Sequence, residues 1–258
     1  MKGESKTHVR EYGGLLERPE KAALLWLARR TPAWINSDHL TLIGLAAMLA
    51  AGAAYWTAAR HRSALIIDVV SLAVNWFGDS LDGTLARFRD CQRPRYGYYV
   101  DHVIDLFGVS ALMAGLAFSG YMNRLIAVSL LAAFALVEAE VFLATYVQRI
   151  FRLSCFRIGP TELRIVLAIG TLYLLHNPWV HIGHRRLLLF DVGGIISVAG
   201  LICAFVYSSL RNTCALYLAE PVPGSAAVPA TDFKQAGETP ALPGRPIPRR
   251  ADSVFVGE

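Results

Sequence analysis

Charged residues are scarce in this sequence, and cysteine is scarcer still. Only 17% of the 258 residues are Asp, Glu, Lys or Arg, whereas 54% are hydrophobic. A soluble domain of this length rarely tolerates that balance, whereas a bundle of helices in lipid requires it. The four cysteines, Cys91, Cys155, Cys203 and Cys214, show neither CxxC spacing nor a regular interval. This argues against a zinc knuckle and against a disulfide framework.

The sequence also shows no internal repeat and no pattern typical of a signal peptide. The first residues, MKGESKTHVREYGG, carry positive charge with no apolar segment directly behind them, so we expect no cleaved signal peptide. The formal net charge is +5, but the basic residues lie between apolar segments rather than along one soluble face. We therefore expect membrane lipids with anionic headgroups as their partners, and no nucleic acid.

Six apolar segments dominate the chain. They cover residues 40–59, 64–88, 97–119, 124–150, 160–176 and 188–211. A helix that crosses the hydrocarbon core of a bilayer needs about 20 apolar residues, and the segments are near that length. The sequence therefore predicts an all-α, polytopic membrane protein with six transmembrane helices.

The ends of the chain differ in character from these spans. Residues 15–30, LLERPEKAALLWLARR, mix leucines with charges and predict an amphipathic helix lying in the membrane interface. Residues 219–258 are rich in Pro, Ala and Gly, a composition that favours disorder. We expect a cytosolic N-terminus with the interfacial helix at 1–38, the membrane domain at 39–218, and a disordered tail at 219–258.

Arginine clusters predict the orientation in the membrane. Two clusters fall on the same side of the six spans as the N-terminus: Arg87, Arg89, Arg93 and Arg95, then Arg149, Arg152, Arg157 and Arg164. Basic loops remain on the cytosolic side, so both termini are expected in the cytosol. Nothing in the chain marks a eukaryotic organelle, and we expect a bacterial cytoplasmic membrane.

Four aspartates at helical spacing stand in the segment GDSLDGTLARFRDCQRPRYGYYVDHVIDLFG, residues 78–108. Asp79 and Asp82 are three positions apart and Asp101 and Asp105 four, so each pair lies on one helical face. The first pair lies roughly 22–27 Å along its helix and the second about 6–12 Å along the next, which runs the opposite way. All four carboxylates are therefore expected to converge near the cytosolic side.

The acidic group needs compensation, because carboxylates at membrane depth are costly unless they are paired, hydrated or bound to cations. Mg²⁺ or Mn²⁺ prefers oxygen ligands, and two such ions can hold a phosphate during displacement. Gly83 and Gly97 remove side chains where a ligand or a helix approaches, and Ala86 is small for the same reason. Arg87 offers two parallel donors to phosphate oxygens.

The complete spacing, Asp79-x2-Asp82-Gly83-x2-Ala86-Arg87, then nine residues, then Gly97-x3-Asp101-x3-Asp105, resembles the signature of the CDP-alcohol phosphotransferase family. The nine-residue gap lies toward the long end of that pattern. The segment PAWINSDHLTLIGL ahead of the first span is also similar to the family.

The resemblance implies a cytosolic active site that binds a CDP-linked donor and an alcohol acceptor and releases CMP. Asp79, Asp82 and Asp101 would hold the metal ions. Asp105 would also lie by the metals and would act as the general base. Gly83, Ala86 and Gly97 would make room for cytidine beside Arg87. A homodimer is likewise expected from the family.

The donor stays open between two classes. We expect CDP-diacylglycerol to donate a phosphatidyl group to a small alcohol in phospholipid synthesis. In the alternative, a CDP-choline or CDP-ethanolamine donates to a lipid alcohol. The Asp101-His102 step and residues 144–164 resemble the second class. The acids Glu138, Glu140 and Glu162 would suit a cationic amine, whereas Arg149, Arg152, Arg157 and Arg164 would suit a phosphorylated acceptor.

A rival from another class is a cation-conducting protein that uses the aspartates as an ion site. The aspartates lie near the cytosolic edge, however, and no second half of the chain repeats them, which argues against a transporter.

Two other polar residues of the segment 64–88 each have two possible roles. Asp68 is expected to contact water or Arg62. Asn75 shares a face with Asp79 and is expected either to line the cavity or to hydrogen-bond another helix.

Overall fold

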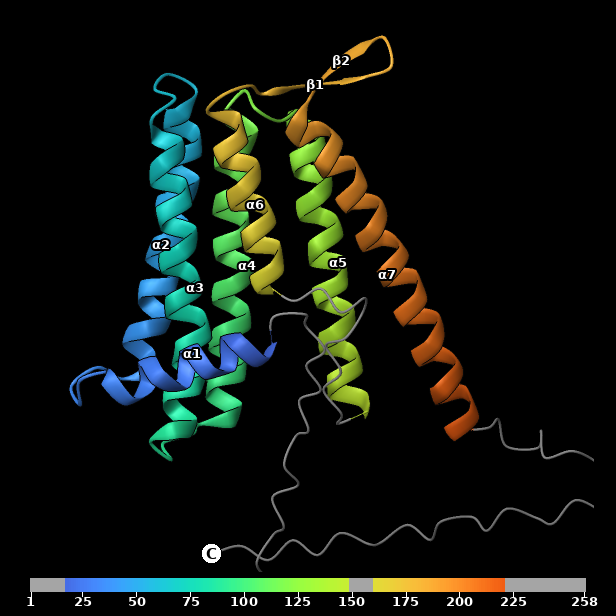
Figure 1. The fold of residues 1–258 in the computed structure, drawn as a ribbon. Coiled ribbons are helices and arrows are strands. Elements are labelled where there is room, and N and C mark those ends of the chain that lie inside the picture. The colour runs from blue at the N-terminus through green and yellow to red at the C-terminus, as the bar shows by residue number, and fades with distance from the viewer. Residues whose placement is uncertain (1–16, 149–159, 221–258) are drawn as a thin grey trace, which may run out of the picture. The chain divides into compact units, whose positions relative to one another are not determined.

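Seven helices and one β-hairpin make up the described part of the chain, residues 17–148 and 160–220 of a computed structural model (Figure 1). In chain order the elements are α1 Glu17–Arg30, α2 Ser37–Ala58, α3 Ala64–Phe88, α4 Pro94–Phe118, α5 Arg124–Gln148, α6 Pro160–Leu174, β1 Trp179–Ile182, β2 Arg185–Leu188 and α7 Leu189–Ala219. Arg149, Arg152, Arg157 and the expected tail from residue 221 onward lie outside the described residues. The elements up to Cys214 belong to one unit, and a second unit begins at Ala215.

Five of the helices, α2, α3, α4, α5 and α7, are long and apolar enough to cross a membrane. The expectation of an all-α membrane protein is therefore confirmed. The segment predicted at 160–176 forms α6, a helix of 15 residues. At 1.5 Å per residue it is about 22 Å long, shorter than the ~30 Å hydrocarbon core.

Large apolar side chains cover the outer faces of these helices. On α3, for example, Ile66, Ile67 and Val70 are 53%, 58% and 56% exposed. Soluble monomers rarely expose contiguous apolar surface on this scale. Lipid chains are the solvent in which such surfaces are stable.

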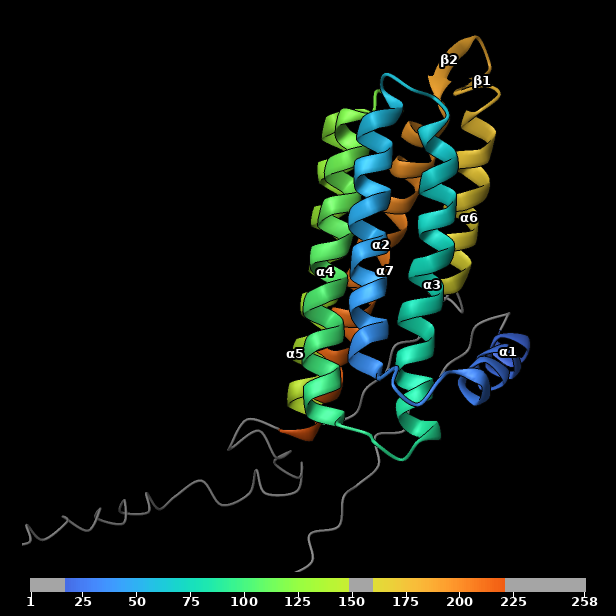
Figure 2. The same cartoon turned by 90° about the vertical axis from the view of Figure 1, so that its left-hand side faces the viewer.

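α2 lies between α3 and α4, as Figure 2 shows. Glycines make this close packing possible. A Cβ atom at Gly115 of α4 would stand 1.9 Å from the Gly52 carbonyl oxygen of α2, and one at Gly78 of α3 would stand 2.6 Å from the Leu40 carbonyl oxygen. Small residues let membrane helices approach in this way. As a result α2 packs closely against both α3 and α4.

α1 runs across the bundle near the α3–α4 connection, while the hairpin lies at the opposite end (Figure 1). The buried side of α1 contributes Leu24 and Ala28 to an apolar cluster with Leu40, Leu81 and Leu85. We call the two extremities of the bundle the α1 end and the hairpin end.

The hairpin was not predicted from the sequence. β1 and β2 are antiparallel, with Ile182 opposite Arg185, and the two-residue turn between them contains Gly183 at φ 59°. A positive φ suits glycine and is typical of such turns.

Candidate metal centre

Three carboxylates meet where α3 and α4 approach each other at the α1 end. Asp79 comes from α3, and Asp101 and Asp105 come from successive turns of α4. One oxygen from each lies within 4.8 Å of those of the other two. All three side chains are partly buried. Three of the four predicted metal ligands are therefore brought together.

Arg164 of α6 completes the surroundings of this group. Its Nη2 donates to Asp79 Oδ2 at 2.5 Å, and its Nη1 is buried without a hydrogen-bond partner. Arg164 therefore pairs with Asp79, while His102 Nδ1 lies 3.9 Å from Asp101 Oδ2. Carboxylate oxygens at this spacing are the donor set that Mg²⁺ and Mn²⁺ prefer. The residues present thus fit a divalent cation.

Asp82, the fourth predicted ligand, is not a member of the three-carboxylate group. Its Oδ2 accepts a hydrogen bond from Thr41 Oγ1 of α2 at 2.6 Å, and its Oδ1 accepts one from the Gly83 backbone N–H. Residues three apart on a helix differ by about 60° in direction. This difference lets Asp79 face α4 while Asp82 contacts α2.

The predicted substrate-binding residues line two separate spaces beyond the aspartates. Arg87 lines a cavity of about 320 Å³ between α1 and α3, and it lies over Gly83, where an added Cβ would stand 3.4 Å from Arg87 Nη1. Ala86 lines a second cavity of about 290 Å³ with residues from the start of α2. Gly97 of α4 is exposed, and a Cβ there would meet nothing within 4 Å. Gly97 and Ala86 therefore border open space, whereas Gly83 is covered by the Arg87 side chain.

The intramembrane glutamates differ in their surroundings. Glu140 accepts hydrogen bonds from Ser208 at 2.8 Å and Asn212 at 2.6 Å, both on α7, so it joins two helices. Glu138 is close enough to Asp105 for a direct electrostatic interaction. Glu162 lies in the first turn of α6. Glu138 and Glu140, two positions apart on α5, therefore have different partners.

Of the two roles expected for Asn75, the structure shows the hydrogen bond to another helix, because its Nδ2 donates to the Gly44 carbonyl oxygen of α2 at 3.0 Å. Asp68 is fully buried at 0% exposure, whereas the sequence led us to expect contact with water or Arg62. Its neighbours include the hydroxyls of Tyr55 and Thr171.

Sequence reasoning did not single out several residues that contact the site. Thr41, which binds Asp82, and Glu20 of α1 were not considered, and Arg164 appeared only as one member of a basic cluster. Each of these partners is 41 or more positions away in the chain from the residue that it contacts. No local spacing connects such residues, so only the packing of α1, α2 and α6 on α3 reveals them.

Residues 34–206 match the profile of a protein family described as CDP-alcohol phosphatidyltransferase. The matched range begins just before α2 and ends within α7, so it contains all eight residues of the predicted signature. No curated protein gives a significant match to the chain.

Proposed function

The chain belongs to the CDP-alcohol phosphatidyltransferase family, and on that premise we propose that it transfers a phosphatidyl group from CDP-diacylglycerol to a small polar alcohol and releases CMP. The meeting of Asp79, Asp101 and Asp105 within 4.8 Å carries the proposal. A group of three acids in a membrane bundle is costly unless it binds cations. A CDP-linked donor brings a diphosphate that requires the same cations.

Asp79, Asp101 and Asp105 would hold the metal, and Asp82, one turn further along α3, would help to hold a second ion. When bound, Mg²⁺ or Mn²⁺ would neutralise the diphosphate and make its phosphorus more electrophilic. The carboxylates themselves fix the position at which the diphosphate binds, because they lie on two helices held together by α2. Gly83, Ala86 and Gly97 border the spaces in which cytidine would lie.

Asp105 would act as the general base. Its carboxylate takes the proton of the acceptor hydroxyl, and the resulting oxygen forms a bond to the β-phosphorus of the donor. The bond from that phosphorus to the bridging oxygen then breaks, and CMP leaves with that oxygen. Arg87 donates to the phosphate of the departing CMP. Arg164, which pairs with Asp79, adds positive charge beside the developing negative charge.

The membrane arrangement that we propose has six spans, with α6 as the fifth of them, and an active site open to the cytosol. The basic residues of the α3–α4 connection support this orientation. α1 would lie in the cytosolic interface of a bacterial membrane, since it crosses the bundle and exposes both Trp26, at 52%, and several cations. We further propose a homodimer and a disordered tail after α7.

A CDP-amino-alcohol donor with a lipid acceptor is the second candidate, and the position of Glu138 favours it. This glutamate interacts electrostatically with Asp105, and it stands on the helix whose Phe142 contacts His102 at 5.1 Å between ring centroids. A carboxylate and aromatic rings together attract a cationic amine. The same acid would have no charged partner in a phosphatidyl acceptor such as glycerol phosphate.

Release of CMP by the purified chain tests the proposal. The protein would be assayed in lipid nanodiscs with Mg²⁺, with CDP-diacylglycerol and CDP-ethanolamine supplied separately against a panel of alcohols. Release that requires CDP-diacylglycerol and one small alcohol is the expected result, and release with CDP-ethanolamine would select the second candidate. Absence of release with every donor, together with cation flux in liposomes, would instead indicate an ion-conducting protein.

A further inference from the structure

α1 is attached to the site by polar contacts as well as by apolar packing. Glu20 Oε1 accepts hydrogen bonds from Trp76 Nε1 at 2.9 Å and from Thr161 Oγ1 at 2.6 Å, with Ser80 Oγ at 3.4 Å. Trp76 and Ser80 flank Asp79 on α3, and Thr161 lies on α6, three residues before Arg164. Glu20 therefore connects α1 to both helices that carry the Asp79–Arg164 pair.

The segment that follows the C-terminal end of α1 is also hydrogen-bonded to the end of α3. Arg89, just beyond α3, donates to the carbonyl oxygens of Ile35 at 2.5 Å, Thr31 at 2.8 Å and Pro32 at 2.9 Å. These carbonyls belong to the segment that joins α1 to α2. Together with the burial of Leu24 against α3, the contacts fix the rotation of α1 about its own axis.

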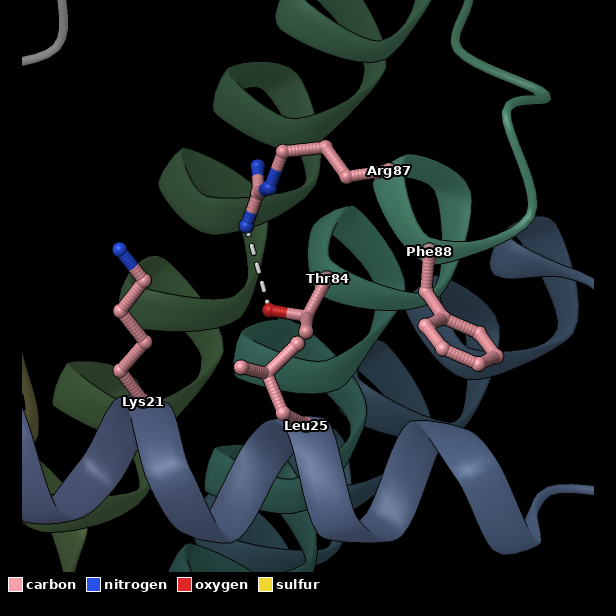
Figure 3. A pocket seen from close by; sticks show the side chains of 5 residues that line it. All are labelled: Lys21, Leu25, Thr84, Arg87 and Phe88. Carbon is pink, nitrogen blue, oxygen red and sulfur yellow. Dashed lines mark hydrogen bonds between the residues drawn. The ribbon is translucent and has the colours of Figure 1, made fainter.

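This fixed rotation brings Lys21 to the cavity that Arg87 lines. The cavity measures about 320 Å³ and is lined by Lys21, Leu25, Thr84, Arg87 and Phe88. Figure 3 shows the Lys21 ammonium group and the Arg87 guanidinium group extending toward the same space from α1 and α3. Arg87 Nη2 is oriented by a hydrogen bond to Thr84 Oγ1 at 3.1 Å. The lining thus contains two cationic side chains and no acidic one.

Arg87, a lining residue of the cavity, stands about 12 Å along α3 from Asp79. Arg87 bends back over Gly83, which is one helical turn, about 6 Å, beyond Asp79 on the same face of α3. A diphosphate bound at the acids would therefore extend toward the two cations. Lys21 lies outside residues 34–206, so the family match assigns it no role.

We propose that Lys21 and Arg87 form a two-cation site for a phosphate group, in which Lys21 is a substrate-binding residue contributed by α1. This inference rests on the proposed function where the phosphate is that of the CDP-linked donor. A phospholipid headgroup presents the same phosphate chemistry at the surface on which α1 lies. In either case α1 is a wall of the binding site rather than only an anchor.

Binding of CDP to the full chain, measured calorimetrically with Mg²⁺ in nanodiscs of zwitterionic lipid, tests the first source. Lys21→Gln should weaken CDP binding about tenfold, since it removes one charge-assisted contact from a partly exposed site. Lys21→Arg should restore most of the affinity. Arg29→Gln is the matched control, because Arg29 is an exposed cation of the same helix that does not line the cavity; we expect a change of less than about twofold.

Binding of a spin-labelled phosphatidylglycerol to the same variants tests the second source. If Lys21→Gln weakens only this lipid, the phosphate belongs to a headgroup, and if it weakens only CDP, the phosphate belongs to the donor. If neither ligand is affected, the two-cation site is refuted. Wild-type protein that fails to bind CDP or to release CMP would refute the proposed function, and the lipid measurement would still decide whether Lys21 binds phosphate.

Discussion

Asp68 and Asp79 stand on the same helix, three turns apart, in opposite surroundings. Asp68 lies toward the hairpin end, where it is fully buried beside Tyr55 and Thr171, both also at 0% exposure. Asp79 lies toward the α1 end, where it is partly exposed and meets two further carboxylates and Arg164. The two aspartates therefore differ in their access to water and in the charged groups around them.

The surroundings of the two regions explain the difference. At the hairpin end the Tyr55 and Thr171 hydroxyls are 2.5 Å apart, within an apolar cluster that includes Leu65 and Leu116. No ion pair joins Asp68 to a lysine or arginine of the described residues, and both of its carboxylate oxygens are buried without a hydrogen-bond partner. At the α1 end three carboxylates instead lie together beside Arg164, an arrangement that could hold a metal ion. The following changes test this contrast, from the largest expected effect to the smallest.

Asp105→Asn should have the largest effect. It removes the proposed base while keeping the size of the side chain, so CMP release should fall about 10²- to 10⁴-fold. Binding of the CDP-linked donor should be largely retained, which calorimetry can measure. Undiminished CMP release would exclude Asp105 as the base. Asp68→Asn provides the control from the hairpin end, and we expect it to leave CMP release within about twofold.

Asp82→Asn should lower the affinity for Mn²⁺ and abolish metal-dependent donor binding. The loss should reach about 10- to 100-fold, because Asp82 either binds an ion directly or orients the residues that do. Electron paramagnetic resonance of free Mn²⁺ measures this affinity. Asp90→Asn is the control, since Asp90 is exposed just beyond α3 and adopts φ 52°, which asparagine tolerates. An unchanged Mn²⁺ affinity in Asp82→Asn would contradict its assignment as a ligand.

Asp68→Ala should destabilise the fold without a direct effect on the metal. Removal of the carboxyl leaves an empty space between three helices beside the Tyr55 and Thr171 hydroxyls, and such a cavity costs about 1–3 kcal/mol. Asp68→Asn should cost less, because the amide keeps the volume of the side chain and leaves no cavity. Thermal unfolding in detergent compares the two variants. Equal loss of stability in both would show that the negative charge itself is required at this position.

The sequence predicted the α1 end better than the hairpin end, and the reason is periodicity. Spacing along α3 and α4 placed Asp79, Asp101 and Asp105 on converging faces, and the structure brings them within 4.8 Å. The same spacing did not separate Asp82 from Asp79, because the direction of Asp82 depends on its contact with Thr41 of another helix. Burial of Asp68 likewise depends on how α2 and α6 pack on α3, which no local pattern contains.

The limits of the helices were also predicted correctly only where local sequence determines them. α3 has the predicted limits, since turn residues bound its apolar segment on both sides. α7 continues eight residues beyond the predicted end at 211, because the polar residues Arg211 and Asn212 do not end a helix whose Asn212 side chain bonds Glu140 on α5. The interval 177–187 was expected as a loop and contains most of the hairpin. Long-range contacts thus decided each point at which the local pattern was insufficient.

Arg164→Gln should have the smallest effect, and its sign distinguishes two roles for the guanidinium. Arg164 now pairs with Asp79 Oδ2 at 2.5 Å, an oxygen that an arriving cation would also bind. Loss of the positive charge leaves the three acids more negative, so Mn²⁺ binding without donor should tighten about threefold, a modest change because the pair is partly exposed. Arg62→Gln, an exposed cation between α2 and α3 at the hairpin end, should change nothing. Weaker Mn²⁺ binding in Arg164→Gln would mean that the ion pair orients Asp79 for the metal instead of competing with it, and the α1 end would then depend on fixed geometry as much as the hairpin end does.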